Sequence, residues 1–194
     1  MNQASKEFFT LGWICALMIL AEYLCHFVVE PASKTLFHHH TFPNLILCLP
    51  KGILIIITWL YRAKGALYLL IAGLISQYVF HANEMDIWFV SIIIIFSIMP
   101  FLVLEMFKLC GIDMYQMPGI ALRKQWRSII LITFVCAICN AIFQAQVLAN
   151  KGVMQDTMML ISNEVLANVT GVLACMLLIS MATRLILLYQ YKNN

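Results

Sequence analysis

Charged residues are scarce in this chain: they make up 11% of its 194 residues, whereas apolar residues make up 63%. Soluble domains carry about 25% charged residues, so a chain this poor in charge cannot cover a water-facing surface. The mean hydropathy of +0.91 points the same way. The scarcity of charge excludes a soluble globular protein, so we expect the lipid bilayer as the main partner and no nucleic-acid partner.

The sequence also lacks the signatures of several enzyme classes. Neither G-x-S-x-G nor H-E-x-x-H occurs, and a P-loop is absent, so the usual marks of hydrolases and nucleotide-binding enzymes are missing. No A-x-A-like cleavage site closes the apolar stretch 8–29, which we therefore interpret as a retained first span. We predict that the protein is not an enzyme and has no catalytic residues and no cofactor.

Long apolar runs dominate the sequence. Unbroken runs such as Ile92–Phe96 exclude the alternating pattern of a membrane β-barrel, and the longer stretches suit helices of about 20 residues that cross a bilayer. The pattern predicts an all-α polytopic transmembrane bundle, with one integral membrane domain over residues 1–194. We expect six spans, at residues 8–29, 45–61, 66–80, 87–107, 128–148 and 158–189.

Basic residues are unequally distributed between the two sides of this bundle. Two of them, Lys34 and Lys151, fall in loops opposite the amino terminus, and Lys51 falls inside a span. By the positive-inside rule, this asymmetry predicts that both termini are cytoplasmic. We expect the protein in the inner membrane of a bacterium. The nine basic residues on the side of the amino terminus are Lys6, Arg62, Lys64, Lys108, Arg123, Lys124, Arg127, Arg184 and Lys192.

Lys51 lies inside the second predicted span, between Pro50 and Gly52. A charge at that depth costs at least about 2.5–3.5 kcal/mol on insertion scales, so it should have a partner or a water-filled cavity. At about 1.5 Å per residue, Lys51 and Glu22 both lie roughly 10 Å below the outer boundary. Opposite charges at one depth on sequential antiparallel helices predict an ion pair, either structural or part of a site.

Polar residues of other spans lie in the same outer half. A histidine follows Glu22 by four positions, two amides lie four apart in the fifth span, and a carboxylate and an amide lie four apart in the sixth. Such groups usually face the bundle interior or a cavity, which favours a pocket that opens outward. Taken singly, they could instead hold helices together. The predicted ligand-binding residues are Glu22, His26, Lys51, Asn140, Gln144, Glu164 and Asn168.

Seven cysteines and a run of histidines invite other interpretations. Cys25 and Cys48 each lie about four residues from the outer end of a predicted helix, so a disulfide is geometrically conceivable. Cys136 and Cys139 lie three apart on one helix, and we interpret them as packing residues because no second ligand pair accompanies them. The three histidines at 38–40 suit a loop, and we predict no metal site because three adjacent residues cannot all reach one ion.

Small residues form two further faces. Gly12 and Ala16 lie four apart in the first span, and Gly171 lies four residues before Cys175 in the last. Small-xxx-small faces of this kind allow helices to approach closely. They indicate either internal packing or contact with other membrane subunits through Gly12, Ala16 and Gly171.

Two motifs resemble parts of a known family. The run Leu49-Pro-Lys-Gly52, followed by Trp59-Leu-Tyr-Arg62-Ala-Lys-Gly65 and Gly73, resembles a segment of MASE1-type membrane sensor domains. In that segment Pro-x-Gly opens an apolar helix, and a basic turn precedes a Gly-containing helix. The run Asn168-Val-Thr-Gly171 resembles the family's closing D-x-x-G helix, with neutral Asn168 in place of the acid. This resemblance implies a membrane sensor.

The predicted architecture also resembles the substrate-binding subunits of energy-coupling-factor transporters, which dock a coupling subunit through small residues of the first helix. We therefore predict a non-enzymatic integral membrane protein that recognises a small ligand or ion from the outer side, as a transport or sensory subunit. The alternative is a structural or accessory subunit packed within a larger membrane protein complex, whose polar residues only join helices.

Overall fold

The structure is a computed structural model, and its described part is helical, with no strands. The predicted loop histidines at 38–40, and Lys34 beside them, lie outside the described residues. The residues that the structure describes are 3–32, 48–82, 86–115, 122–150, 152 and 157–193.

Five of the described helices are long and apolar enough to cross a membrane. The all-helical class predicted from the long apolar runs is therefore confirmed. The helices are α1 (Gln3–Leu24), which continues into the π-helical turn η1 (Cys25–Val29), then α3 (Leu49–His81), α4 (Ile87–Leu109), α5 (Leu122–Asn150) and α6 (Thr157–Asn193).

The backbone of α3 turns sharply at Arg62, whose φ is 56° and ψ is −135°. Past this turn, Gly65 lies against the preceding half of the helix: a Cβ added to it would meet the carbonyl oxygen of Ile57 at 2.7 Å. A straight helix would hold residues eight apart at about 12 Å, so α3 folds back on itself. Its two halves correspond to the stretches 45–61 and 66–80 that the sequence predicts as separate spans.

The first half of α3 runs antiparallel to α1. Near the start of α3, Leu49 belongs to the same buried apolar cluster as Cys25, at the end of α1 and the beginning of η1. Near the turn, Tyr61 lines a pocket together with Phe9, which lies close to the beginning of α1. The two segments therefore pack side by side along their length.

The second half of α3 runs parallel to α1. Just after the turn, Lys64 pairs with Glu7 near the beginning of α1. Fifteen residues later in α1, Glu22 accepts a hydrogen bond of 2.7 Å from Gln77, thirteen residues beyond Lys64. This hairpin within α3 brings polar residues from both of its halves to the end of α1.

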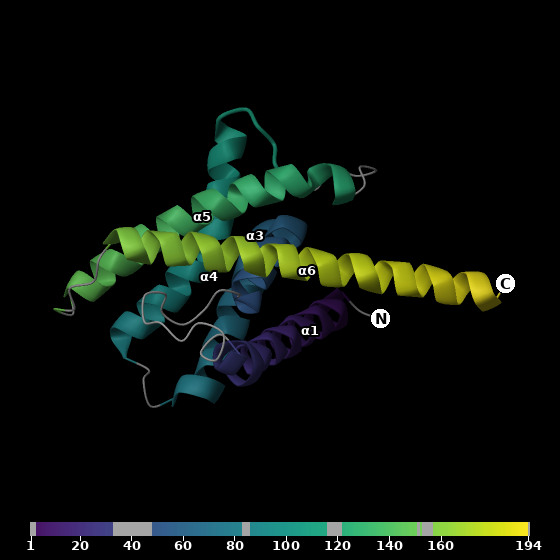
Figure 1. Ribbon diagram of the computed structural model, residues 1–194, viewed down its shortest axis with the longest axis horizontal. Coiled ribbons are helices and arrows are strands. Elements are labelled where there is room, and N and C mark those ends of the chain that lie inside the picture. Colours follow the sequence, from purple (N-terminus) through teal and green to yellow (C-terminus); the bar gives the residue numbers. More distant parts are fainter. Residues whose placement is uncertain are drawn as a thin grey trace.

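The first half of α3 also crosses α6, in backbone contact. A Cβ added to Gly171 would lie 2.1 Å from the carbonyl oxygen of Cys48, and one added to Gly52 would lie 2.5 Å from the carbonyl oxygen of Gly171. The backbone N–H of Cys48 donates to the carbonyl of Ala167 across this crossing, at 3.4 Å. Only glycine leaves room for such an approach. Figure 1 shows α6 passing across α3.

The two apolar clusters of the core share α3 as their centre. One joins α3 to α1 and α6, and the other joins α3 to α4, α5 and α6. Trp59 of α3 is 1% exposed and belongs to the second cluster. Its indole N–H donates to the carbonyl of Met114 at 2.8 Å, so the segment that follows α4 is tied to the turn of α3.

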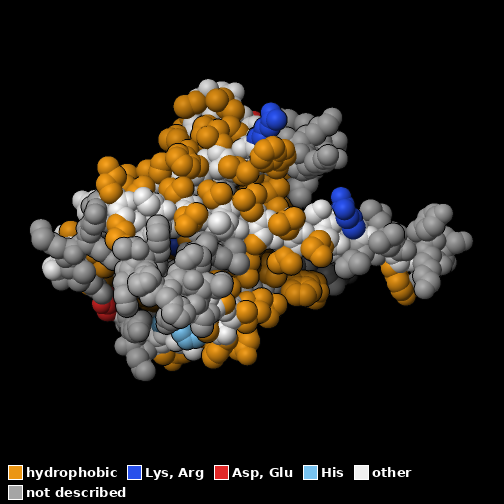
Figure 2. All heavy atoms as spheres, viewed as in Figure 1, with side chains coloured by type: hydrophobic (Ala, Val, Ile, Leu, Met, Phe, Trp, Pro, Cys, Tyr) orange, Lys and Arg blue, Asp and Glu red, His pale blue; other side chains and the backbone are white. Residues whose placement is uncertain are grey.

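Apolar side chains dominate the face of the molecule in Figure 2, with few charges among them. Large apolar residues are widely exposed, among them Phe8 (80%) and Leu109 (87%). Exposure of this extent requires lipid or protein as cover. The surface is therefore consistent with a membrane-embedded protein.

The last helix is longer than a bilayer requires. Its 37 residues extend about 55 Å, compared with about 30 Å for the hydrocarbon core of a membrane. Its C-terminal part runs beyond the other helices in Figure 1.

Candidate functional site

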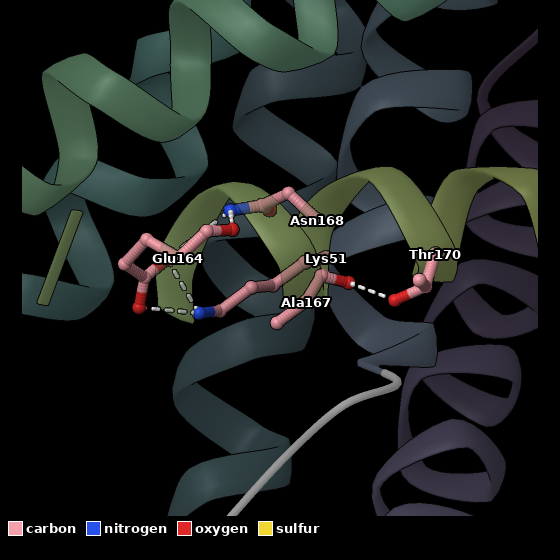
Figure 3. Close-up of polar contacts among 5 residues, drawn as sticks. All are labelled: Lys51, Glu164, Ala167, Asn168 and Thr170. Carbon is pink, nitrogen blue, oxygen red and sulfur yellow. Dashed lines mark hydrogen bonds and ion pairs between the residues drawn. The ribbon is translucent and has the colours of Figure 1, made fainter. Parts of the chain in front are cut away.

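An ion pair joins the first turn of α3 to α6. The ammonium of Lys51 donates to both carboxylate oxygens of Glu164, each at 2.6 Å. One turn later, the side-chain amide of Asn168 donates to the same carboxylate at 3.1 Å and to the backbone carbonyl of Glu164 at 2.7 Å. Figure 3 shows Asn168 and Lys51 both directed to this carboxylate. Charge-assisted hydrogen bonds of this kind are the strong ones.

The pair is largely withdrawn from solvent. The side chains of Lys51 and Glu164 are 17% and 9% exposed. On another side, the Lys51 ammonium lies 5.2 Å from the ring centroid of Phe96 in α4. An aromatic face attracts a cation most strongly where water is excluded, so Phe96 adds to the stabilisation of Lys51. Residues of α6 and α4 therefore hold the ammonium of Lys51 on two sides.

The predicted ion pair between Glu22 and Lys51 is wrong, because Lys51 bonds to Glu164 instead. Glu22 accepts a hydrogen bond from Gln77, although it lies close enough to Lys51 for electrostatic attraction. Matching depths on sequential helices identify the layer in which a charge lies but leave open which helix faces it. The close crossing at Gly171 brings α6 within reach of Lys51 and decides the partner.

We call the polar residues at the depth of Lys51, Glu22 and Glu164 the layer around Lys51. His26 lies at its predicted outer end. Its ring nitrogen Nδ1 lies 3.1 Å from the carboxylate of Glu30, and its side chain is 49% exposed. The His26 ring centroid lies 6.1 Å from that of His81, at the end of α3. With Glu22 one turn below, these residues form a polar stripe that leads from the layer to the surface.

The two predicted amides of α5 are not bonded to the Lys51 ion pair. Asn140 is 4% exposed, and neither its side-chain oxygen nor that of Gln144 has a hydrogen-bond partner. A buried carbonyl oxygen without a partner costs free energy, which makes these oxygens acceptors for a donor or a cation. The structure therefore separates the seven predicted residues into a joined set around Lys51 and Glu22 and a second set on α5.

Two pockets of the described residues lie away from the predicted site. One pocket, with a volume of about 270 Å³, is lined by apolar side chains of α1, α3 and α6 and contains none of the seven residues. No group of three or more His, Cys, Asp or Glu residues within the described ranges could hold a metal ion.

A second polar cluster lies at the turn of α3, and its contact between Arg62 and Tyr115 is not among the sequence predictions. The guanidinium of Arg62 lies 4.6 Å from the ring centroid of Tyr115, whose hydroxyl donates to Glu105 at 2.6 Å. Lys108 lies 3.7 Å from the same carboxylate. Burial, and then the hydrogen bond to Glu105, raise the pKa of Tyr115 above its usual value. The basic turn Arg62-Ala-Lys-Gly65 could have indicated a polar cluster here, but nothing in the sequence predicts that Tyr115 contacts it.

The small residues of α1 and α6 differ in whether they pack inside the chain or remain available to another subunit. Gly171 packs inside the chain, against Cys48 and Gly52, so it belongs to internal packing and is not free for another subunit. A Cβ added to Gly12 would meet nothing within 4 Å, and Ala16 is exposed on the same helix. Of the two predicted small-residue faces, the one on α1 therefore lies at the surface.

Comparisons with protein-family models, with curated proteins and with solved structures find no match to this chain. The fold and the site define an apolar, all-helical protein with a buried ion-pair network, and its function has to be argued from these residues.

Proposed function

We propose that the protein is an integral membrane protein of a bacterial inner membrane that recognises a small cation, or a ligand with a positively charged group, from the outer side. Its role would be that of a transport or sensory subunit. It has six spans, because each half of α3 crosses the membrane separately, and both termini are cytoplasmic. The positive-inside asymmetry and the turn at Arg62 support this arrangement.

The charge balance of the layer around Lys51 carries the proposal. The layer holds two carboxylates, Glu22 and Glu164, for one lysine, and that lysine donates to both oxygens of Glu164. Glu22 is bonded to the neutral amide of Gln77. An intramembrane carboxylate is expensive unless it forms an ion pair, and the lysine that attracts Glu22 is already bonded to Glu164. A small cation, a proton included, would balance Glu22, and the stripe through His26 provides a route from outside.

A structural subunit of a larger membrane complex is the second candidate. The observation that favours it is the crossing of α3 and α6, where the Lys51–Glu164 pair and the Gly52–Gly171 contact lie within one helical turn of α3 and about two turns of α6. Polar and small residues together are the usual means of joining membrane helices. In this interpretation the exposed face of α1 around Gly12 contacts a partner.

Thermal unfolding of the purified protein tests the first candidate. At constant ionic strength, choline chloride is replaced by NaCl, KCl or methylammonium chloride, and the pH is varied separately. We expect at least one of these cations, or a lower pH, to raise the unfolding midpoint of the natural protein. Glu22→Gln should abolish the increase. The matched control is Glu7→Gln, since Glu7 forms an exposed pair with Lys64 at the other end of α1 and should leave the increase unchanged.

Two results would overturn the first candidate: a midpoint that responds to no cation or proton, or a response that persists in Glu22→Gln. Stoichiometric copurification with a large assembly, together with either of these results, would favour the structural subunit.

A further inference from the structure

Two thiols meet where α1 ends and α3 begins. Cys25 is the first residue of the π-helical turn η1, and Cys48 is the residue that precedes α3. Cys25 belongs to the same buried cluster as Leu49, the residue after Cys48. The two thiols lie within hydrogen-bonding reach of each other, and the residues are 3% and 8% exposed. The two residues are 23 positions apart in sequence, so their contact is a product of the fold.

This thiol pair lies directly next to the layer around Lys51. Glu22 precedes Cys25 by three residues, and Lys51 follows Cys48 by three, so each thiol is about one turn from a charged group on its own helix. Both charges act electrostatically on Cys48. A covalent bond between the thiols would therefore join the two helices that carry Glu22 and Lys51, at one end of their charged layer.

The other described cysteines are placed differently. Cys136 and Cys139 belong to a single helix, α5, and Cys110 is exposed at the end of α4. Cys15 lies within α1 and is half-buried. The thiol of Cys175 donates to the carbonyl of Leu49 at 3.7 Å and lies near enough to Cys48 for an electrostatic interaction. Cys25 and Cys48 are, among the described cysteines, the two thiols within hydrogen-bonding reach at the ends of two different helices.

We propose that Cys25 and Cys48 form a disulfide when the chain meets an oxidising environment. The oxidant is an exchangeable disulfide of another thiol compound or protein. One cysteine thiolate attacks that disulfide and breaks its S–S bond, which forms a mixed disulfide and releases the first oxidant sulfur as a thiol. The second cysteine then attacks the mixed disulfide, so that the Cys25–Cys48 bond forms and the second oxidant sulfur leaves as a thiol. Both electrons and both protons pass to the oxidant.

The orientation under Proposed function puts this pair on the outer side of the membrane, where disulfides persist. Formation of the disulfide in cells rests on that orientation, whereas the choice of Cys25 and Cys48 as partners does not. Because both thiols are buried in the folded chain, the exchange takes place before the helices pack or when the end of α1 opens.

Thiol counting tests the inference. Cells that express the chain are quenched with acid, and the protein is alkylated in denaturant with a maleimide polymer, before and after reduction. We expect two fewer reactive thiols than the seven cysteines before reduction, all seven after it, and a linked peptide of Cys25 and Cys48 by mass spectrometry. Cys25→Ala should leave its six remaining thiols reactive. The matched control, Cys136→Ala with Cys139→Ala, should still lose two.

A parallel sample of the purified, folded protein is treated with diamide, a small membrane-permeant oxidant of thiols. If all seven thiols stay reactive both in quenched cells and after diamide, or if a different pair is linked, the inference is wrong. If the Cys25–Cys48 link forms only with diamide, the pairing stands and the outer orientation under Proposed function fails.

Discussion

Replacing Lys51 by methionine would remove the positive charge at the crossing of α3 and α6 while keeping a long apolar side chain. Glu164 would keep its hydrogen bond from Asn168 but would lose both bonds from the ammonium. Since its side chain is only 9% exposed, water cannot replace them. The change therefore leaves a buried carboxylate without its counter-charge.

The size of the effect follows from leaving one charge of a buried ion pair without its partner. Removing one partner of such a pair costs about 3–5 kcal/mol. We therefore expect Lys51→Met to lower the free energy of unfolding by about this amount.

The assay is unfolding by sodium dodecyl sulfate from a mild detergent, followed by helical circular dichroism at pH 7. Adding Glu164→Gln to Lys51→Met should recover most of the lost stability, because intramembrane polar contacts are worth only about 0.6 kcal/mol on average. Lys64→Met removes a lysine from an exposed pair with Glu7 and should change stability little. A double variant as unstable as Lys51→Met would refute the account of a stranded carboxylate.

Two further predictions concern the backbone and use the same unfolding assay. Gly171→Ala should be strongly destabilising, because the added Cβ would lie 2.1 Å from a backbone oxygen across the helix crossing. At Gly12 nothing lies within 4 Å of an added Cβ, so Gly12→Ala should raise the free energy of unfolding by up to about 1 kcal/mol through its higher helix propensity. Equal effects at the two glycines would contradict the close crossing. Because Arg62 has a φ of 56°, Arg62→Gly should be more stable than Arg62→Ala by about 1–2 kcal/mol, and the opposite order would argue against the turn in α3.

Composition and run length were sufficient to predict the fold class. A chain with 63% apolar residues must bury its backbone polar groups in helices if it lies in lipid, and long helices are what the structure contains. The turn at Arg62 was also readable, since Arg62-Ala-Lys-Gly65 interrupts an apolar run with charge and supplies the glycine that the folded-back halves require. Its direction, in contrast, depends on packing against α1 and could not be read from the run.

Sequence reasoning identified the layer of the candidate site but not its pairing. The cost of a charge in lipid made a partner for Lys51 necessary, and both Glu22 and Glu164 lay at suitable depths. The rotation of each helix about its axis selects between them, and that rotation follows from how neighbouring helices pack. The unbonded side-chain oxygens of Asn140 and Gln144 could not be foreseen for the same reason.

The order of residues along the chain thus specifies a lipid-embedded helical protein with an obligatory neutralisation of Lys51, because solvation energies depend on residue type and depth alone. The identity of the neutralising group, the thiol contact between Cys25 and Cys48, and the docking of Tyr115 on Arg62 depend on which helix faces meet. Those choices come from the glycine-mediated crossing of α3 and α6 and from the fold-back of α3, which bring together residues that lie far apart in sequence.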